Sequence, residues 1–129
     1  MNRDLTLFVS RIAMSAVFLF SGFDKLINWQ AAVTEATSLG LPSSAVIFTI
    51  IVQLVGAIAV LSGIFFRWGI LALLLFTLIA TLIAHWPLGL PENAWRMALT
   101  ISLEHLAIIG GFLLLLVIGP GKIAFGRPS

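Results

Sequence analysis

The chain has 129 residues, of which 60% are hydrophobic and only 9% are charged. Because soluble domains average about 25% charged residues, this composition indicates an integral membrane protein of a single domain. The seven Lys and Arg residues form no basic run, which argues against nucleic acid as a partner. With no cysteine, the chain itself supplies neither disulfides nor thiol chemistry.

Apolar runs of membrane-spanning length occur four times along the chain. One crossing takes about 20 mostly apolar residues as a helix, and the predicted spans are residues 5–23, 44–66, 69–86 and 97–118. We therefore expect an all-α, integral membrane four-helix bundle surrounded by the lipid bilayer. The first run has no Ala-x-Ala cleavage pattern at its end, so it is predicted to be a retained helix rather than a secretory signal.

The segment between the first two spans is more polar. Asp24 and Lys25 open it and are expected at the outer rim of the bundle. Apolar residues then recur at helical spacing: Trp29, Val33, Ala36 and Leu39. Asn28 is a suitable N-cap, and Gly40 with Pro42 supplies a stop. This pattern predicts a short amphipathic helix in the membrane interface, acting either as a packed connector or as a lid.

Single polar residues interrupt the first two spans. Arg11 lies about 6 residues into the first span, where its long side chain either anchors at the headgroups or makes a buried polar contact. Gln53 lies near the middle of the second span and either bonds to another helix or serves a ligand. The short turn Phe66-Arg67-Trp68-Gly69 then forces the third span to run antiparallel to the second, with Arg67 at the membrane surface.

The last span carries Glu104 beside His105. A charge at such a depth costs a few kcal/mol, so Glu104 is expected to face protein, water or a ligand. A rise of about 1.5 Å per residue puts Gln53 roughly 13 Å and Glu104 roughly 12 Å below the outer surface. The predicted polar pocket in the outer half of the bundle consists of Gln53, His85, Glu104 and His105. In the alternative interpretation, these groups only bond to one another and close the bundle.

Several chemistries can be weighed for this predicted pocket. By residue count His85 and His105 differ in depth by roughly 10 Å, which argues against haem ligation by the pair. No residues have metal-ligand spacing, so no metal site is predicted. A proton relay through Glu104 and His105 is chemically reasonable. No cofactor is evident, but an apolar slot with donors from Gln53, His85 or His105 is compatible with quinone.

The distribution of Lys and Arg predicts the orientation of the chain. The positive residues on one side are Arg3, Arg11, Arg67, Lys122 and Arg127. Only Lys25 and Arg96 fall on the other side. Because positive residues concentrate on the cytoplasmic side, both termini are predicted to be cytoplasmic.

Short motifs in this order resemble the DoxX family of small bacterial inner-membrane proteins. They are Arg11, Phe20-Ser21-Gly22-x-x-Lys25, Gly40-Leu41-Pro42, Gln53-x-x-Gly56, Gly63-x-x-x-Arg67, His85, Gly110-Gly111 and Gly119-Pro120-Gly121. The resemblance implies a four-helix membrane bundle. Some members of the family are subunits of thiosulfate:quinone oxidoreductase, and others are similar to membrane partners of oxidative-stress or thiol-redox systems.

One departure from the family pattern concerns the acidic residue. Related members carry Glu at the position of Gln53, and often Lys-Asn at the position of Glu104-His105. Because facing positions permit such an exchange, Gln53 and Glu104 are predicted to be neighbours. The family's carboxylate on the second span is missing here, so no catalytic residue is carried over.

Three functions follow as expectations. The first is an accessory membrane subunit of a redox system, linked to quinone or to sulfur or oxidative-stress chemistry, with a protein partner. The second is a binding or transport module for a small molecule or lipid, without electron transfer. The third is a structural anchor for a partner protein. A homo-oligomer is compatible with each of them.

Overall fold

The computed structural model describes residues 2–125, which form helices, turns and connecting segments without a strand. The helices are α1 (Arg3–Ile27), α2 (Trp29–Ser38), α3 (Ser44–Ser62), α4 (Phe66–Ala84) and α5 (Glu92–Ile118). All except α2 are long and apolar enough to cross a membrane. The prediction of an all-α protein with four spans and a short helix after the first is confirmed.

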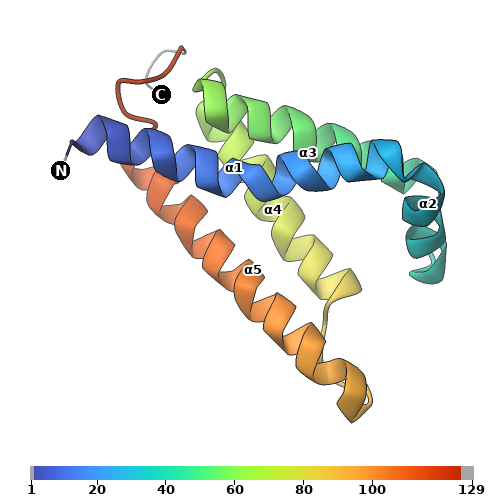
Figure 1. The fold of residues 1–129 in the computed structure, drawn as a ribbon. Helices are drawn as coiled ribbons and strands as arrows, with labels where there is room; N and C mark the ends of the chain where they lie inside the picture. The colour runs from blue at the N-terminus through green and yellow to red at the C-terminus, as the bar shows by residue number, and fades with distance from the viewer. Residues whose placement is uncertain (1, 126–129) are drawn as a thin grey trace.

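The four long helices form two arms that diverge from one end (Figure 1). Helix α1 lies along α3, and α4 lies beside α5. The arms meet through α3 and α4 near the α3–α4 turn, and α2 lies at the far end of the α1–α3 arm. Helices α1 and α5 make only limited contact, and no Cα atom of α3 lies within 8 Å of one in α5. We call the converging end the closed end and the diverging end the open end.

The turn between α3 and α4 differs from its prediction. Helix α3 ends at Ser62 because Gly63 takes the left-handed C-cap conformation, with φ +84°. Helix α4 then begins at Phe66, so the predicted turn at residues 66–69 was wrong, and Arg67 lies exposed in the first turn of α4. The antiparallel course of the two helices, which the short connection predicted, is seen in Figure 1.

Small residues bring α3 and α4 close together. A Cβ atom added at Gly69 would lie 2.7 Å from the Cβ atom of Ala59 and 3.0 Å from the carbonyl oxygen of Gly56. At such separations an added side chain would force the two helices to shift. Glycine at position 69 therefore lets α4 pack against the backbone of α3.

The short helix α2 follows Asn28, as predicted, but Asn28 does not cap it with its side chain. Its amide instead donates to the carboxylate of Asp24, at 2.8 Å. The buried face of α2 consists of Ala32 and Ala36, which belong to a small apolar cluster with residues of α3. Trp29, which was expected on the apolar face, is 37% exposed.

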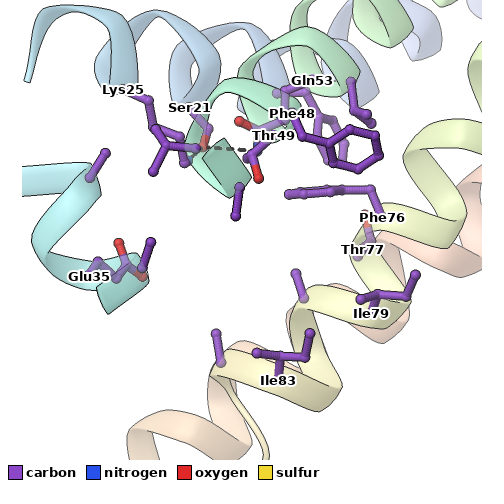
Figure 2. A pocket seen from close by; sticks show the side chains of 18 of the residues that line it. Ser21, Lys25, Glu35, Phe48, Thr49, Gln53, Phe76, Thr77, Ile79 and Ile83 are labelled. Atoms are coloured by element: carbon purple, nitrogen blue, oxygen red, sulfur yellow. Dashed lines mark hydrogen bonds between the residues drawn. The ribbon is translucent and has the colours of Figure 1, made fainter. Parts of the chain in front are cut away.

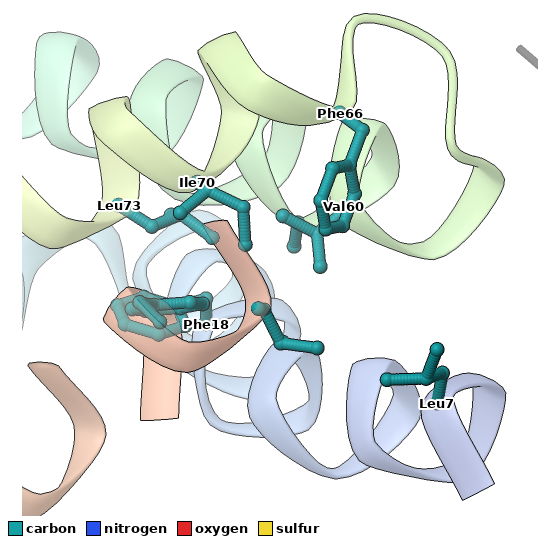
Figure 3. Close-up of a cluster of buried hydrophobic side chains, with 9 residues drawn as sticks. Leu7, Phe18, Val60, Phe66, Ile70 and Leu73 are labelled. Carbon is teal, nitrogen blue, oxygen red and sulfur yellow. The ribbon is translucent and has the colours of Figure 1, made fainter. Parts of the chain in front are cut away.

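A hydrophobic core fills the closed end (Figure 3). It combines side chains from α1, α3, α4 and α5: Leu7, Phe18, Ala57, Val60, Phe66, Ile70, Leu73, Phe112 and Leu115. The rings of Phe18 and Phe112 pack with their centroids 5.7 Å apart and join α1 to α5. This core fixes the junction from which the two arms diverge.

Arg11 is fully buried at the closed end. Its guanidinium donates to the carbonyl oxygens of Val60, at 3.2 Å, and Leu61, at 2.8 Å, and to that of Ile123. The first two carbonyls belong to the last turn of α3, where no intrahelical donor is available. Of the two predicted roles for Arg11, the structure shows the buried polar contact and not the headgroup anchor.

The segment after α5 lies across the closed end. The backbone N–H of Lys122 donates to the Asp4 carboxylate at 3.0 Å, and that of Phe125 donates to the Ser62 carbonyl at 2.7 Å. With the bond from Arg11 to Ile123, these contacts tie this segment to α1 and to the end of α3. Both ends of the described chain therefore lie at the closed end.

Candidate functional site

A cavity of about 670 Å³ lies at the open end between the two arms. All five helices contribute to its lining, which is mostly apolar. The polar side chains in the lining are Ser21, Lys25, Glu35, Thr49, Gln53, Thr77, His85 and His105. Figure 2 shows the polar residues of α1, α2 and α3 on one side of the cavity and Ile79 and Ile83 of α4 on the other.

Ser21 is the centre of a hydrogen-bonded group in the cavity wall. Lys25 lies one helical turn further along α1, and its ammonium donates to the Ser21 hydroxyl oxygen at 2.6 Å. The Gln53 amide of α3 donates to the same oxygen at 3.0 Å. Because both bonds use the oxygen as acceptor, the O–H proton of Ser21 is available for a ligand.

The carbonyl oxygen of Gln53 has no hydrogen-bond partner among the described residues. The side chain is only 4% exposed. A buried acceptor without a partner costs about 1–3 kcal/mol. Two other buried polar atoms without partners, Arg11 Nε and Ser15 Oγ, belong to residues outside the cavity lining. Gln53 is thus the lining residue that has a buried acceptor without a partner.

His85 and His105 lie side by side, with ring centroids 5.3 Å apart and the rings edge to face. The predicted depth difference of roughly 10 Å was wrong. Helix α5 begins at Glu92, earlier than predicted, and the Ser102 hydroxyl donates to the His85 carbonyl oxygen at 2.7 Å. The end of α4 is therefore level with the middle of α5, so depth is no argument against joint ligation by this pair.

The Thr81 hydroxyl joins His105 to α4. Its oxygen lies 2.7 Å from the Thr77 carbonyl oxygen, to which the hydroxyl donates, and 2.7 Å from Nδ1 of His105. These contacts fix the ring of His105 in the cavity lining. Among residues 2–125, no three His, Asp or Glu side chains gather as metal ligands.

Glu104 is exposed and does not line the cavity. The prediction that it neighbours Gln53 was wrong, because no Cα atom of α5 approaches α3 within 8 Å and the Gln53 amide bonds to Ser21 instead. Of the four predicted pocket residues, the structure brings Gln53, His85 and His105 to one cavity and leaves Glu104 outside. Asp24, expected at the rim, is exposed and also lies outside the lining.

Sequence reasoning missed the polar lining residues Ser21, Glu35, Thr49 and Thr77, and it placed Lys25 only at the rim. The sequence did contain a signal for Ser21. Ser21 and Lys25 are four residues apart, which puts them on one face of a helix. Glu35 had no such signal, because only the position of α2 beside the cavity brings it there.

The sequence profile of the DoxX family matches residues 6–86. The chain belongs to the DoxX family. The match runs from α1 to the end of α4, so it includes every lining residue of the cavity except His105 and Ile108. The cavity therefore lies almost wholly within the family's shared region, whereas Glu104 lies beyond it.

Two proteins of Escherichia coli (strain K12) are similar to this chain over nearly its whole length. Inner membrane protein YphA is 29% identical over 97% of this chain and 91% of its own length. Inner membrane protein YqjF is 27% identical over 96% of this chain and 92% of its own length. No solved structure matches the chain significantly. Together with the four apolar helices, these relatives identify a multi-pass inner-membrane protein.

Proposed function

We propose that this DoxX protein is a membrane-embedded binding protein for an amphipathic molecule. The polar group of the ligand lies at Ser21, Lys25 and Gln53, and its apolar part lies between α3 and α4. The observation that carries the proposal is the unpaired, buried carbonyl of Gln53 in the wall of a mostly apolar cavity. A ligand that donates to this oxygen removes the cost of leaving it unpaired.

The size and position of the cavity support this proposal. Its volume of about 670 Å³ falls within the range of about 300–1,000 Å³ found for small-molecule sites. Several apolar lining residues are more than half exposed, among them Phe48 on α3 and Leu75 and Ile79 on α4. In a spanning helix such exposed apolar side chains face lipid, so a ligand can enter sideways from the bilayer.

A redox-linked function is a second candidate, because the same groups suit a quinol. A quinol hydroxyl can donate to the Gln53 carbonyl, and the Ser21 hydroxyl and Lys25 ammonium can donate to a ring oxygen. The DoxX protein would then be an accessory subunit that holds the quinol for an electron-transferring partner protein. Binding of a lipid, without electron transfer, uses the same cavity.

The experiment is native mass spectrometry of the protein released from membranes, with solvent extraction to identify bound molecules. Gln53→Leu is expected to lose the bound molecule, because it removes the buried acceptor while keeping a similar volume. Gln30→Leu is the matched control: the same change on α2, at an exposed residue outside the lining. Equal ligand content in both variants and the wild type would overturn the proposal.

We also propose that the closed end faces the cytoplasm. The bond between Lys122 and Asp4 holds the two ends of the described chain together, so both lie on one side of the membrane. Most Lys and Arg residues are at this end, which favours the cytoplasmic side; Arg127 lies outside the described residues. Reporter fusions after Gly40 and after the last residue are expected to report opposite compartments, with the second in the cytoplasm.

A further inference from the structure

Two opposite charges line the end of the cavity nearest α2. Lys25 projects from α1 and Glu35 from α2, and Figure 2 shows both on the same side of the cavity, clearly apart from each other. The ammonium of Lys25 bonds to the Ser21 hydroxyl and not to a carboxylate. A single ligand that carries both a negative and a positive group can therefore pair with both residues.

A third group lies deeper, at Gln53. Its carbonyl oxygen needs a donor, while the Ser21 hydroxyl and the remaining N–H groups of Lys25 need acceptors. The wall thus presents a cation with a hydroxyl donor, a carboxylate, and a separate buried carbonyl acceptor. Elsewhere the lining is mostly apolar, and its residues Phe48 and Ile79 are 67% and 53% exposed.

We infer that the cavity binds a monoacyl phospholipid with an ethanolamine head group. The inference rests on the proposed binding function and names its ligand class. The phosphate accepts hydrogen bonds from Lys25 and Ser21, and the terminal ammonium donates to the Glu35 carboxylate. The free glycerol hydroxyl of the monoacyl lipid donates to Gln53. The single acyl chain lies between α3 and α4.

Each competing ligand leaves one of these groups without a partner. A diacyl phospholipid has no glycerol hydroxyl and leaves the Gln53 carbonyl unpaired. Lysophosphatidic acid has no ammonium and leaves Glu35 unpaired. A quinol can accept from Lys25 but has no ammonium for Glu35, which it leaves unpaired. The monoacyl ethanolamine lipid is the one among these that pairs with all three.

The experiment is a titration of the full-length protein in nanodiscs, read by native mass spectrometry. The probes are lysophosphatidylethanolamine and lysophosphatidic acid with the same acyl chain. The wild type is expected to bind the ethanolamine lipid about three- to tenfold more tightly, as suits one exposed ion pair. Glu35→Gln is expected to abolish this preference. Asp24→Asn, which removes a nearby exposed carboxylate outside the lining, is expected to keep it.

A second arm tests the hydroxyl. Gln53→Leu is expected to weaken binding of the monoacyl lipid while leaving that of diacyl phosphatidylethanolamine unchanged. An unaltered preference in Glu35→Gln, or a quinol as the molecule that Gln53→Leu loses, would overturn the head-group assignment and leave the binding function standing. If neither Glu35→Gln nor Gln53→Leu changes the binding of any probe, both proposals fail.

Discussion

The closed and open ends of this DoxX protein differ in what their main buried polar side chains contact. At the closed end, Arg11 is fully buried and donates to three backbone carbonyls, so that α3 and the segment after α5 are tied to α1. At the open end, Gln53 is almost as deeply buried but keeps an unpaired acceptor beside a cavity. The paired nitrogens of Arg11 hold helices together, whereas Gln53 has an unpaired acceptor and, unlike Arg11 and Ser15 with their own unpaired atoms, lines the cavity.

The same contrast holds for apolar packing. The core at the closed end combines side chains of four helices, and glycine lets α3 and α4 meet closely there. At the open end the two arms diverge, and α1 and α5 lie apart from each other. We expect the closed end to determine stability and the open end to determine binding, and the following changes test that division.

The largest loss of stability is expected for Arg11→Met. Three carbonyls lose their donor, at roughly 1 kcal/mol each, so the free energy of unfolding should fall by about 3 kcal/mol. The measurement is equilibrium unfolding in mixed detergent micelles. Arg67→Met changes an exposed Arg near the same end and should cost little. A stability of Arg11→Met within about 0.5 kcal/mol of the wild type would show that the closed end does not depend on this residue.

Gly69→Ala should cause the next largest loss of stability, about 1–3 kcal/mol. The added methyl group would meet Ala59 and the backbone of Gly56. Gly110→Ala is the matched control within another spanning helix, since a Cβ atom there meets nothing within 4 Å. It should be neutral or slightly stabilising, because alanine favours the helix over glycine. Thermal unfolding of the two variants side by side measures the difference, and equal melting temperatures would contradict it.

At the open end, Ser21→Ala should cost less stability, about 1 kcal/mol, as it removes one acceptor shared by Lys25 and Gln53. Ser21→Ala should nevertheless reduce the amount of bound ligand more strongly than the folded fraction of Arg11→Met or of Gly69→Ala. Ser10→Ala, whose hydroxyl bonds only within α1, is the control. Native mass spectrometry and unfolding on the same samples separate the two effects; loss of stability without loss of ligand would count against the division.

The smallest effect is expected for the coupling energy between Glu104→Leu and Gln53→Leu. Because α3 and α5 are apart, the two changes should be additive within about 0.5 kcal/mol in a double-mutant cycle. A coupling above about 1 kcal/mol would mean that the two side chains meet, against the arrangement described.

The positions of the helices could be predicted from the sequence. The four spans, the short helix between Asn28 and Gly40, and the end of α5 before Gly119-Pro120 follow from local hydrophobicity, helical period and stop signals. The importance of Gln53 as a polar group in an apolar helix was also evident, because such a residue must find a partner inside a membrane. Features that depend only on residues close together in one helix can be predicted from the sequence.

Apart from the antiparallel pair α3 and α4, only the tertiary structure shows which helices meet and at what level. Counting residues from a common surface misplaced His85 against His105, because α5 begins well before the level at which α4 ends. The exchange of the acidic residue relative to related members paired Gln53 with Glu104, although α3 and α5 do not meet. The sequence also left Arg11 undecided between lipid and protein. Local sequence specifies helix lengths, but tilt, crossing and relative depth arise from packing between helices, which no single segment encodes.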